Sequence, residues 1–213
     1  LIDATYTESV TIPVLLGSSS TNTVTIKPAS GKTVIWTSAS TTSGTLRLNG
    51  ADYIIVDGSN NGTTSRDITI SNTATATFSV PVWISSLGTG AGASNITIKN
   101  CNLKGGSTSL TTSYGVFIAG QTLSATGTGD DNDNISIQNN IITRAYTGIY
   151  AKASVTGINN SLTVLGNTIG SSTSTEFIGR YGINLSFATG STVSNNTIFG
   201  VSSTLGNAFG IAA

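Results

Sequence analysis

The sequence predicts an all-β fold, a β-solenoid built from about seven stacked coils. Three observations lead to this prediction. Apolar and polar residues alternate in short runs, these runs recur at intervals of 22 to 39 residues, and no stretch shows the helical period. A single coil of this length cannot bury its apolar side chains alone, so stacked coils must bury them together and pair their backbones with one another.

One register of apolar positions marks a first strand in each coil. The residue two positions earlier is apolar in all but the last coil, and the residue between them is polar. The register consists of Ile26, Leu48, Ile70, Ile98, Ile137, Val164 and Val193. The polar residues expected to face outward beside it are Thr25, Arg47, Thr69, Thr97, Ser136, Thr163 and Thr192. Period-two alternation of this kind predicts strands with one face in the core.

A second register marks a second strand in the later coils. A glycine precedes an apolar residue at Gly115, Gly148, Gly182 and Gly210. An aromatic residue precedes three of these glycines, as Tyr181 precedes Gly182. We therefore expect two short strands in each coil, with a bend between them and loops of variable length outside.

Paired asparagines mark the bend after the first strand. In the stretch NISIQNNII, Asn139 and Asn140 separate two apolar alternations. The first Asn suits the left-handed backbone of a sharp bend. The second is expected to point inward, where amides of successive coils form a hydrogen-bonded ladder of Asn140, Asn167 and Asn196. Cys101 occupies the equivalent place in an earlier coil, so we expect a packed thiol, and a lone cysteine leaves no disulfide within the chain.

Composition narrows the possible functions. Charged residues make up 8% of the chain, the formal net charge is zero, and there is no histidine. The absence of His excludes Ser-His and Cys-His nucleophiles and histidine metal sites within this chain. Zero net charge removes the electrostatic basis for binding nucleic acid. No apolar run approaches the length of a membrane span, so we expect no membrane insertion.

Two stretches connect the repeat to a known superfamily. They read LNGADYIIVDGSNNG at 48–62 and RDITISNT at 66–73. Together with the coil repeat, they resemble the parallel β-helix of pectin-lyase-like proteins, and in particular large secreted surface proteins of Bacteroidetes-type bacteria. The resemblance covers nearly the whole chain. It implies a single-stranded right-handed parallel β-helix and a secreted, extracellular location at the cell surface.

The whole chain, 1–213, is expected to form one parallel β-helix domain. Residues 1–20 are expected to act as an N-terminal cap or opening strand, since Val10 and Ile12 can fold over the first full coil. The last coil has no comparable cover, so we expect the chain to belong to a longer polypeptide or to dock on another subunit. The expected partners are therefore its own flanking domains or identical subunits, with polysaccharide as a further candidate.

The catalytic motifs that the resemblance implies are missing. Polygalacturonase-like members carry a Gly-His-Gly segment, and pectin-esterase-like members carry a Gln-Asp-Thr segment, whereas neither Gln121 nor Gln138 precedes an Asp. Pectate-lyase-like members need a carboxylate cluster near an Arg base, and the outward row has no carboxylate beside Arg47. We therefore expect no catalytic residues and no cofactor apart from a candidate calcium ion. The sequence favours a function other than catalysis.

Two groups of side chains are candidates for a binding site. The first lies in the acidic stretch GTGDDNDN, whose carboxylates suit calcium, with a solvated turn as the alternative. These metal candidates are Asp130, Asp131 and Asp133. The second lies near the second strand, where outward-facing aromatic rings can form a platform for carbohydrate, with packing at the bend as the alternative. These carbohydrate-binding candidates are Tyr114, Tyr150 and Tyr181.

Two functions stay open on these grounds. The first is a structural or adhesive β-helical segment of a secreted or surface-displayed bacterial protein, self-associating or filament-forming. The second is a carbohydrate-binding or carbohydrate-active domain, similar to polysaccharide lyases or hydrolases, whose site lies in loops or flanking domains. Ice binding is a remote third, because ice-binding solenoids carry Thr-x-Thr in every coil and only Thr23 and Thr25 fit that pattern here.

Overall fold

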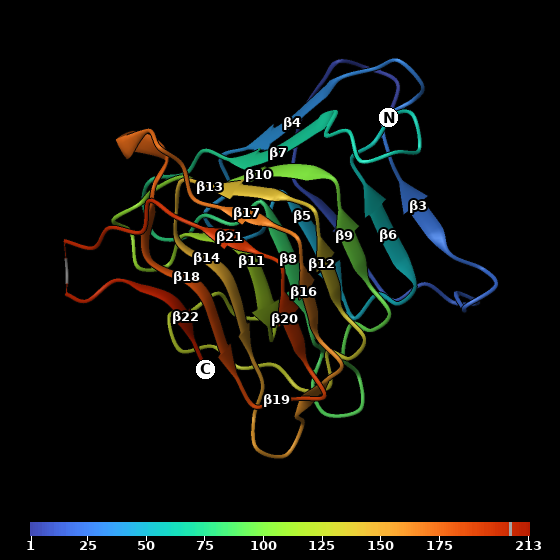
Figure 1. The fold of residues 1–213 in the computed structure, drawn as a ribbon. Coiled ribbons are helices and arrows are strands. Elements are labelled where there is room, and N and C mark those ends of the chain that lie inside the picture. The colour runs from blue at the N-terminus through green and yellow to red at the C-terminus, as the bar shows by residue number, and fades with distance from the viewer. Residues whose placement is uncertain (205) are drawn as a thin grey trace.

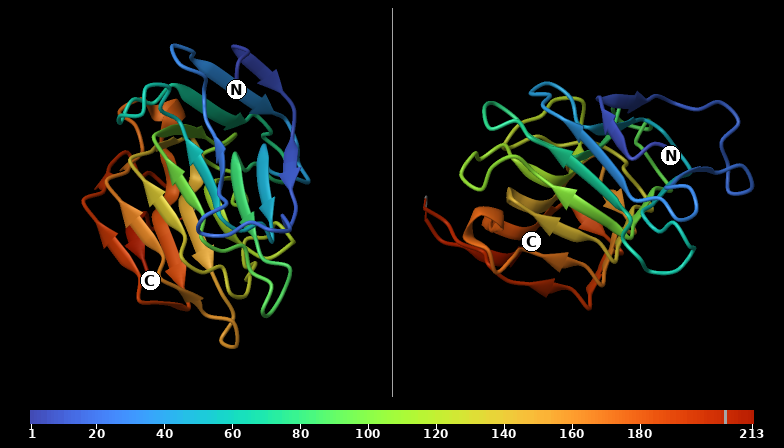
Figure 2. Two further views of the ribbon diagram at one scale, coloured as in Figure 1. Left: turned by 90° about the vertical axis from the view of Figure 1, so that its right-hand side faces the viewer. Right: turned by 90° about the horizontal axis from the view of Figure 1, so that it is seen from above.

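The chain folds into a parallel β-helix, described by a computed structural model over residues 1–204 and 206–213. Three parallel sheets surround a common core, and each turn of the chain adds one strand to each sheet in the same order (Figure 1). The views in Figure 2 show the coils stacked in chain order from the N-terminal to the C-terminal end. The predicted β-solenoid of about seven coils is confirmed.

Within each sheet, neighbouring strands come from successive coils and are hydrogen-bonded to one another. Sheet 1 contains β1 (Thr5–Thr7), β4 (Val34–Ser38), β7 (Ile68–Asn72), β10 (Cys101–Lys104), β13 (Ile141–Thr143), β17 (Thr168–Ile169) and β21 (Thr197–Ile198). Sheet 2 contains β2 (Val10–Ile12), β5 (Leu46–Asn49), β8 (Val82–Ser85), β11 (Tyr114–Ala119), β14 (Ala145–Lys152), β18 (Ile178–Ser186) and β22 (Phe209–Ala212). Sheet 3 contains β3 (Val24–Ile26), β6 (Ile54–Asp57), β9 (Thr97–Lys99), β12 (Ser136–Gln138), β16 (Thr163–Leu165) and β20 (Thr192–Ser194).

Three short elements lie outside the three main sheets. Strands β15 (Asn159–Asn160) and β19 (Ala188–Thr189) pair with each other, and η1 (Ser174–Glu176) is a single 3-10 turn. Within the described ranges, no helix has the length and apolar character needed to cross a membrane.

Each coil has three strands, so the expectation of two strands per coil is wrong. The strand marked by the apolar register of the later coils belongs to sheet 3, and the strand marked by glycine belongs to sheet 2. Between them, the residues that follow the Asn bend form a short strand of sheet 1, such as β13. This strand was missed because an alternation interrupted by a two-residue bend reads as one element in the sequence.

The predicted apolar register holds in the later coils and is wrong in the earlier ones. Ile98, Ile137, Val164 and Val193 do share one column of sheet 3. Leu48, however, pairs with Ile84 in sheet 2, and Ile70 pairs with Leu103 in sheet 1. Val56 takes their place and joins Ile26 to the column. Alternation with period two shows that a strand is half-buried, but it does not show which sheet the strand belongs to.

The outward row of sheet 3 changes accordingly. It contains Thr25, Ile55, Thr97, Ser136, Thr163 and Thr192, so Arg47 and Thr69 belong to other faces. Ile55 interrupts the hydroxyl side chains with an apolar one. The row is therefore less regular than the repeat of the coils in the sequence predicted.

The asparagine ladder is present in the core and satisfies backbone groups of neighbouring coils. The side-chain oxygen of Asn167 accepts hydrogen bonds from the backbone N–H and the amide of Asn140, at 2.9 and 3.1 Å. The amide of Asn167 donates to the carbonyl of Ile137 at 2.8 Å and to the Asn196 side-chain oxygen at 2.9 Å. Cys101 continues the ladder, because its N–H donates to the Asn140 side chain at 2.9 Å. Its free thiol is buried, as expected.

The residue before each ladder position has the backbone conformation predicted for the first Asn of a pair. Asn100, Asn139 and Asn195 have φ values of 57°, 50° and 55°, in the left-handed region, and Gly166 has the same role with φ 65°. Asn and Gly are the residues that tolerate this backbone best. The bend between sheets 3 and 1 therefore repeats with the same geometry in successive coils.

The glycine register of sheet 2 marks a close approach between coils. Gly148 is aligned with Gly182, and a methyl group added to Gly148 would lie 2.5 Å from the Gly182 carbonyl oxygen and 2.6 Å from Cγ2 of Ile169. Such contacts leave no space for a side chain. The equivalent position at Gly210, on the last strand, has no atom within 4 Å.

Candidate functional site

Sheet 2 carries two outward rows of side chains that are rich in aromatic residues. The first row runs through Arg47, Trp83, Phe117, Tyr150 and Asn184. The second row runs through Tyr114, Thr147, Tyr181 and Phe209. The second row faces outward because the glycines that follow Tyr114, Thr147 and Tyr181 face inward, toward isoleucines of sheet 1. The three tyrosines named from the sequence therefore lie on one face.

A loop, residues 120–129, covers the part of this face that lies over β11. The Tyr114 hydroxyl donates to the carbonyl of Ser124 at 2.9 Å, and the Tyr150 hydroxyl donates to the carbonyl of Gly127 at 2.9 Å. The loop also inserts Leu123, which is 5% exposed, into the aromatic cluster. Tyr114 and Tyr150 are each 1% exposed. Burial raises the pKa of Tyr150 to about 12 and also raises the pKa of Tyr114, so both hydroxyls stay protonated as donors.

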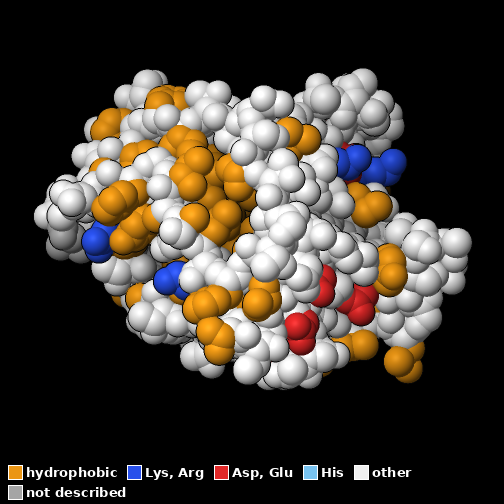
Figure 3. Space-filling view, turned by 60° about the horizontal axis from the view of Figure 1, so that its bottom comes forward, with side chains coloured by type: hydrophobic (Ala, Val, Ile, Leu, Met, Phe, Trp, Pro, Cys, Tyr) orange, Lys and Arg blue, Asp and Glu red, His pale blue; other side chains and the backbone are white. Residues whose placement is uncertain are grey.

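Beyond this cover, toward β18 and β22, the face opens into a groove of about 300 Å³ that we call the open groove. Its lining consists of Thr111, Tyr114, Ala125, Tyr146, Thr147, Tyr150, Lys152, Arg180, Tyr181 and Asn184. Just outside it, Phe209 stacks on Tyr181 with ring centroids 5.4 Å apart and planes inclined by 12°. Figure 3 shows a face where hydrophobic side chains gather on one part with basic side chains beside them, while a group of acidic side chains lies on another part of the same face.

The open groove is basic. The guanidinium of Arg180 lies 5.0 Å from the ring centroid of Tyr181 and donates to the Tyr146 hydroxyl at 3.3 Å. The ammonium of Lys152 lies 5.4 Å from the ring centroid of Tyr150. The lining contains no Asp or Glu, and the ion pairs of the described residues, Lys99 with Asp57 and Lys104 with Glu176, lie elsewhere. The positive charge of the groove is therefore not neutralised by the described part of the chain.

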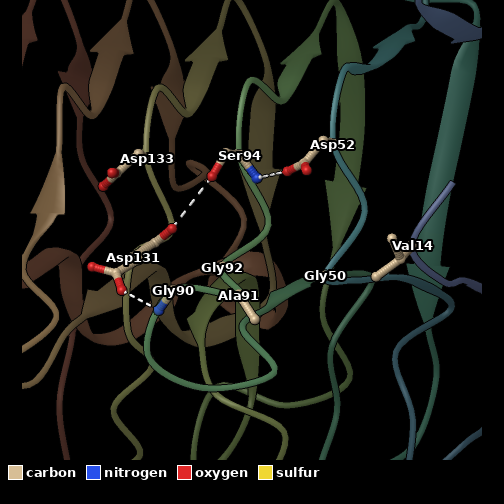
Figure 4. Close-up of a pocket in the computed structure, with 9 residues that line it drawn as sticks. All are labelled: Val14, Gly50, Asp52, Gly90, Ala91, Gly92, Ser94, Asp131 and Asp133. Carbon is tan, nitrogen blue, oxygen red and sulfur yellow. Dashed lines mark hydrogen bonds between the residues drawn. The ribbon is translucent and has the colours of Figure 1, made fainter. Parts of the chain in front are cut away.

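The acidic residues line a different hollow, of about 530 Å³, where loops of successive coils meet (Figure 4). Asp52 accepts a hydrogen bond from the Ser94 N–H at 2.7 Å. Asp131 accepts one from the Gly90 N–H at 2.6 Å. Each carboxylate thus ties its own loop to that of a neighbouring coil.

The remaining two members of the acidic stretch make separate contacts. Asp133 accepts a hydrogen bond from the Asn160 N–H at 2.6 Å, and Asp130 accepts one from the Thr89 hydroxyl at 2.6 Å. Hydrogen bonds from Ser154 and Thr89 lower the pKa of Asp130. In the part of the chain that the structure describes, no three His, Cys, Asp or Glu residues are grouped as metal ligands. Calcium binding by this stretch stays a prediction.

Several residues that line the open groove were not among the binding candidates from the sequence, including both of its basic residues. Tyr146, Lys152 and Arg180 flank the glycine motifs of β14 and β18. Their proximity to Gly148 and Gly182 was a usable signal, because residues beside an aligned motif are stacked in space. The cover over Tyr114 and Tyr150 had no signal in the sequence, since it depends on the path of loop 120–129.

The fold and the groove together define a parallel β-helix protein with a basic, aromatic groove on sheet 2. No known family profile and no curated protein matches the sequence. Among solved structures, the chain is similar to an alginate lyase from Paenibacillus sp. str. FPU-7, with 11% sequence identity and a TM-score of 0.36. The alignment covers 98% of this chain and 89% of that protein. At this identity and score, the likeness carries no inference about activity.

Proposed function

We propose that this chain is a β-helical segment of a secreted or surface-displayed protein and adheres to acidic polysaccharide through the open groove. One observation carries the proposal. Arg180 and Lys152 lie beside the aromatic rings of the groove without an acidic partner among the described residues. Cations and rings in one groove favour a ligand that combines negative charge with a flat apolar face.

An acidic sugar has both of these properties. The planar guanidinium of Arg180 suits a carboxylate or a sulfate, because it can donate two parallel hydrogen bonds to such a group. The half-exposed ring of Tyr181, backed by Phe209, offers a surface for the apolar C–H face of a pyranose ring. Asn184 adds a neutral polar group that can bond to sugar hydroxyls.

Isothermal titration calorimetry with an oligogalacturonate and with a neutral glucan oligomer tests this function. We expect binding of the acidic sugar only, and weaker binding as the salt concentration rises. Arg180→Gln should weaken binding about tenfold or more, because a hydrogen bond to a charged group is worth about 1.5–3 kcal/mol. Lys32→Gln removes an exposed charge outside the groove and should leave binding unchanged. Equal binding of the neutral glucan, or no binding of either sugar, would contradict the proposal.

The location is tested separately on intact cells that produce the chain. A protease added outside the cells should remove the chain while a cytoplasmic marker persists. Protection of the chain until the cells are lysed would argue against surface display.

A further inference from the structure

The open groove is closed at the side that faces β11. Loop 120–129 lies directly on the aromatic floor there, as the hydrogen bonds from Tyr114 and Tyr150 to its carbonyl groups show. The contact is tight, because a methyl group added to Gly127 would lie 3.3 Å from the ring of Phe117, which is 0% exposed. No extended chain can pass between the loop and the floor.

The loop at the other end of β11 borders the same groove. Thr111 precedes β11 and Ala125 follows it, and both line the groove. Tyr114 is buried behind these two residues and forms the rear wall of the open groove. On the opposite side, toward β18 and β22, the ring of Phe209 is 37% exposed, and Tyr181 and Asn184 are half-buried. The two loops that flank β11 therefore close the groove on one side, and the groove is open on the side of β18 and β22.

We infer that the open groove binds the terminal sugars of an acidic polysaccharide chain and not an internal stretch, an inference that rests on the function proposed above. A chain entering over Tyr181 meets the wall at Ala125 and stops there. The volume of about 300 Å³ is at the lower end of the range for small-ligand sites, so it accommodates a short segment. Arg180 and Lys152 then hold the acidic groups of that segment.

The dependence of affinity on chain length separates the two binding modes. An internal segment can occupy the groove in more registers as the chain grows, so the affinity per chain rises in proportion to their number. A terminal segment offers one register whatever the length. We propose to measure the dissociation constant per chain for oligogalacturonates of defined length, from short oligomers to long chains.

We expect the affinity per chain to be constant once the oligomer fills the groove. Affinity that increases in proportion to chain length would overturn end recognition and would leave the proposed function standing. Binding at no length would overturn both. The three outcomes are distinct, so failure of this inference is not confused with failure of the function.

Two loop variants test the position of the wall. Ala125→Trp fills the groove from an exposed lining position and should weaken binding at every chain length by about tenfold. Thr122→Trp adds the same ring at an exposed position of the same loop outside the lining, and should leave binding unchanged. Circular dichroism checks that both variants keep the fold. Equal losses in the two variants, or no loss in either, would overturn the placement of the ligand end against this loop.

Discussion

Replacement of Asn167 by Leu tests how much the asparagine ladder stabilises the fold. The change keeps the number and branching of the side-chain heavy atoms and removes all four side-chain hydrogen bonds. Asn167 is 1% exposed, so water cannot readily replace those bonds. The backbone N–H of Asn140 loses the acceptor it has in the structure, and the carbonyl of Ile137 loses a donor.

The expected loss follows from these two groups. The buried N–H of Asn140 left without a partner costs about 1–3 kcal/mol, and the hydrogen bond lost by the carbonyl of Ile137 costs about 1 kcal/mol, so these two groups together give about 3 kcal/mol. For a chain of this size, 1 kcal/mol shifts the melting temperature by about 2–4 °C. The variant should therefore melt about 6–12 °C below the wild-type protein.

Thermal melts followed by circular dichroism measure this shift, with Asn196→Leu as the matched control. Asn196 is half-buried, and its amide donates to the carbonyl groups of Val164 and Ser194 at 2.8 and 3.0 Å. Its side-chain oxygen also accepts hydrogen bonds from the backbone N–H and the amide of Asn167, each at 2.9 Å. Because water can reach this half-buried outer rung and replace part of these bonds, its loss should cost less than that of Asn167. A shift for Asn167→Leu no larger than that of the control would show that the ladder does not stabilise the core.

Four further outcomes are expected. In urea titrations, Gly148→Ala should lower the free energy of unfolding by about 1–3 kcal/mol, because the added methyl group overlaps the next coil. Gly210→Ala has open space around the added methyl group and should leave the free energy of unfolding nearly unchanged. The pKa of Tyr150 is raised in the folded state, so its contribution to stability is complete below its unfolded pKa of about 10 and is lost as the pH rises toward 12. Tyr150→Phe should therefore lose less stability than the wild type over this alkaline range, and an equal loss would contradict the raised pKa of Tyr150 in the folded state. The thiol of Cys101 is buried and its pKa is raised, so a thiol reagent should react only after denaturation; reaction of the native protein would contradict this burial. A calcium chelator should leave the melting temperature unchanged, and a decrease that Asp131→Asn abolishes would show a calcium site in the acidic stretch.

Much of the fold was readable from the sequence because its repeats are nearly regular in the later coils. Asn140 and Asn167 are 27 residues apart and occupy the same place in successive coils, so local pattern and tertiary position coincide. In the earlier coils Leu48 and Ile70 have the same alternation but lie in different sheets. Alternation reports only that one face of a strand is buried, so three half-buried sheets are indistinguishable by this signal alone.

The site was less predictable than the fold. The position of Tyr181 beside an aligned glycine was enough to place it on the outer face of sheet 2. Burial of Tyr114 and Tyr150 depends on hydrogen bonds to the carbonyl groups of loop 120–129, and backbone carbonyls leave no trace in the sequence. The basic character of the groove was hidden for another reason. A net charge of zero says nothing about how Arg180 and Lys152 are separated from the acidic residues.

The equivalence of successive rungs in the ladder has a consequence for how such a chain changes length in evolution. Asn140 and Asn167 hold the same bend, and each strand between them pairs only with the coil before and the coil after. Duplication or excision of the gene segment between two such asparagines adds or removes one full layer and joins matching backbone conformations. The core side chains can then pack as before, because each coil already packs against a coil of similar structure. Recombination at such positions would therefore change the length by whole layers, while each loop could diverge without altering the layers around it.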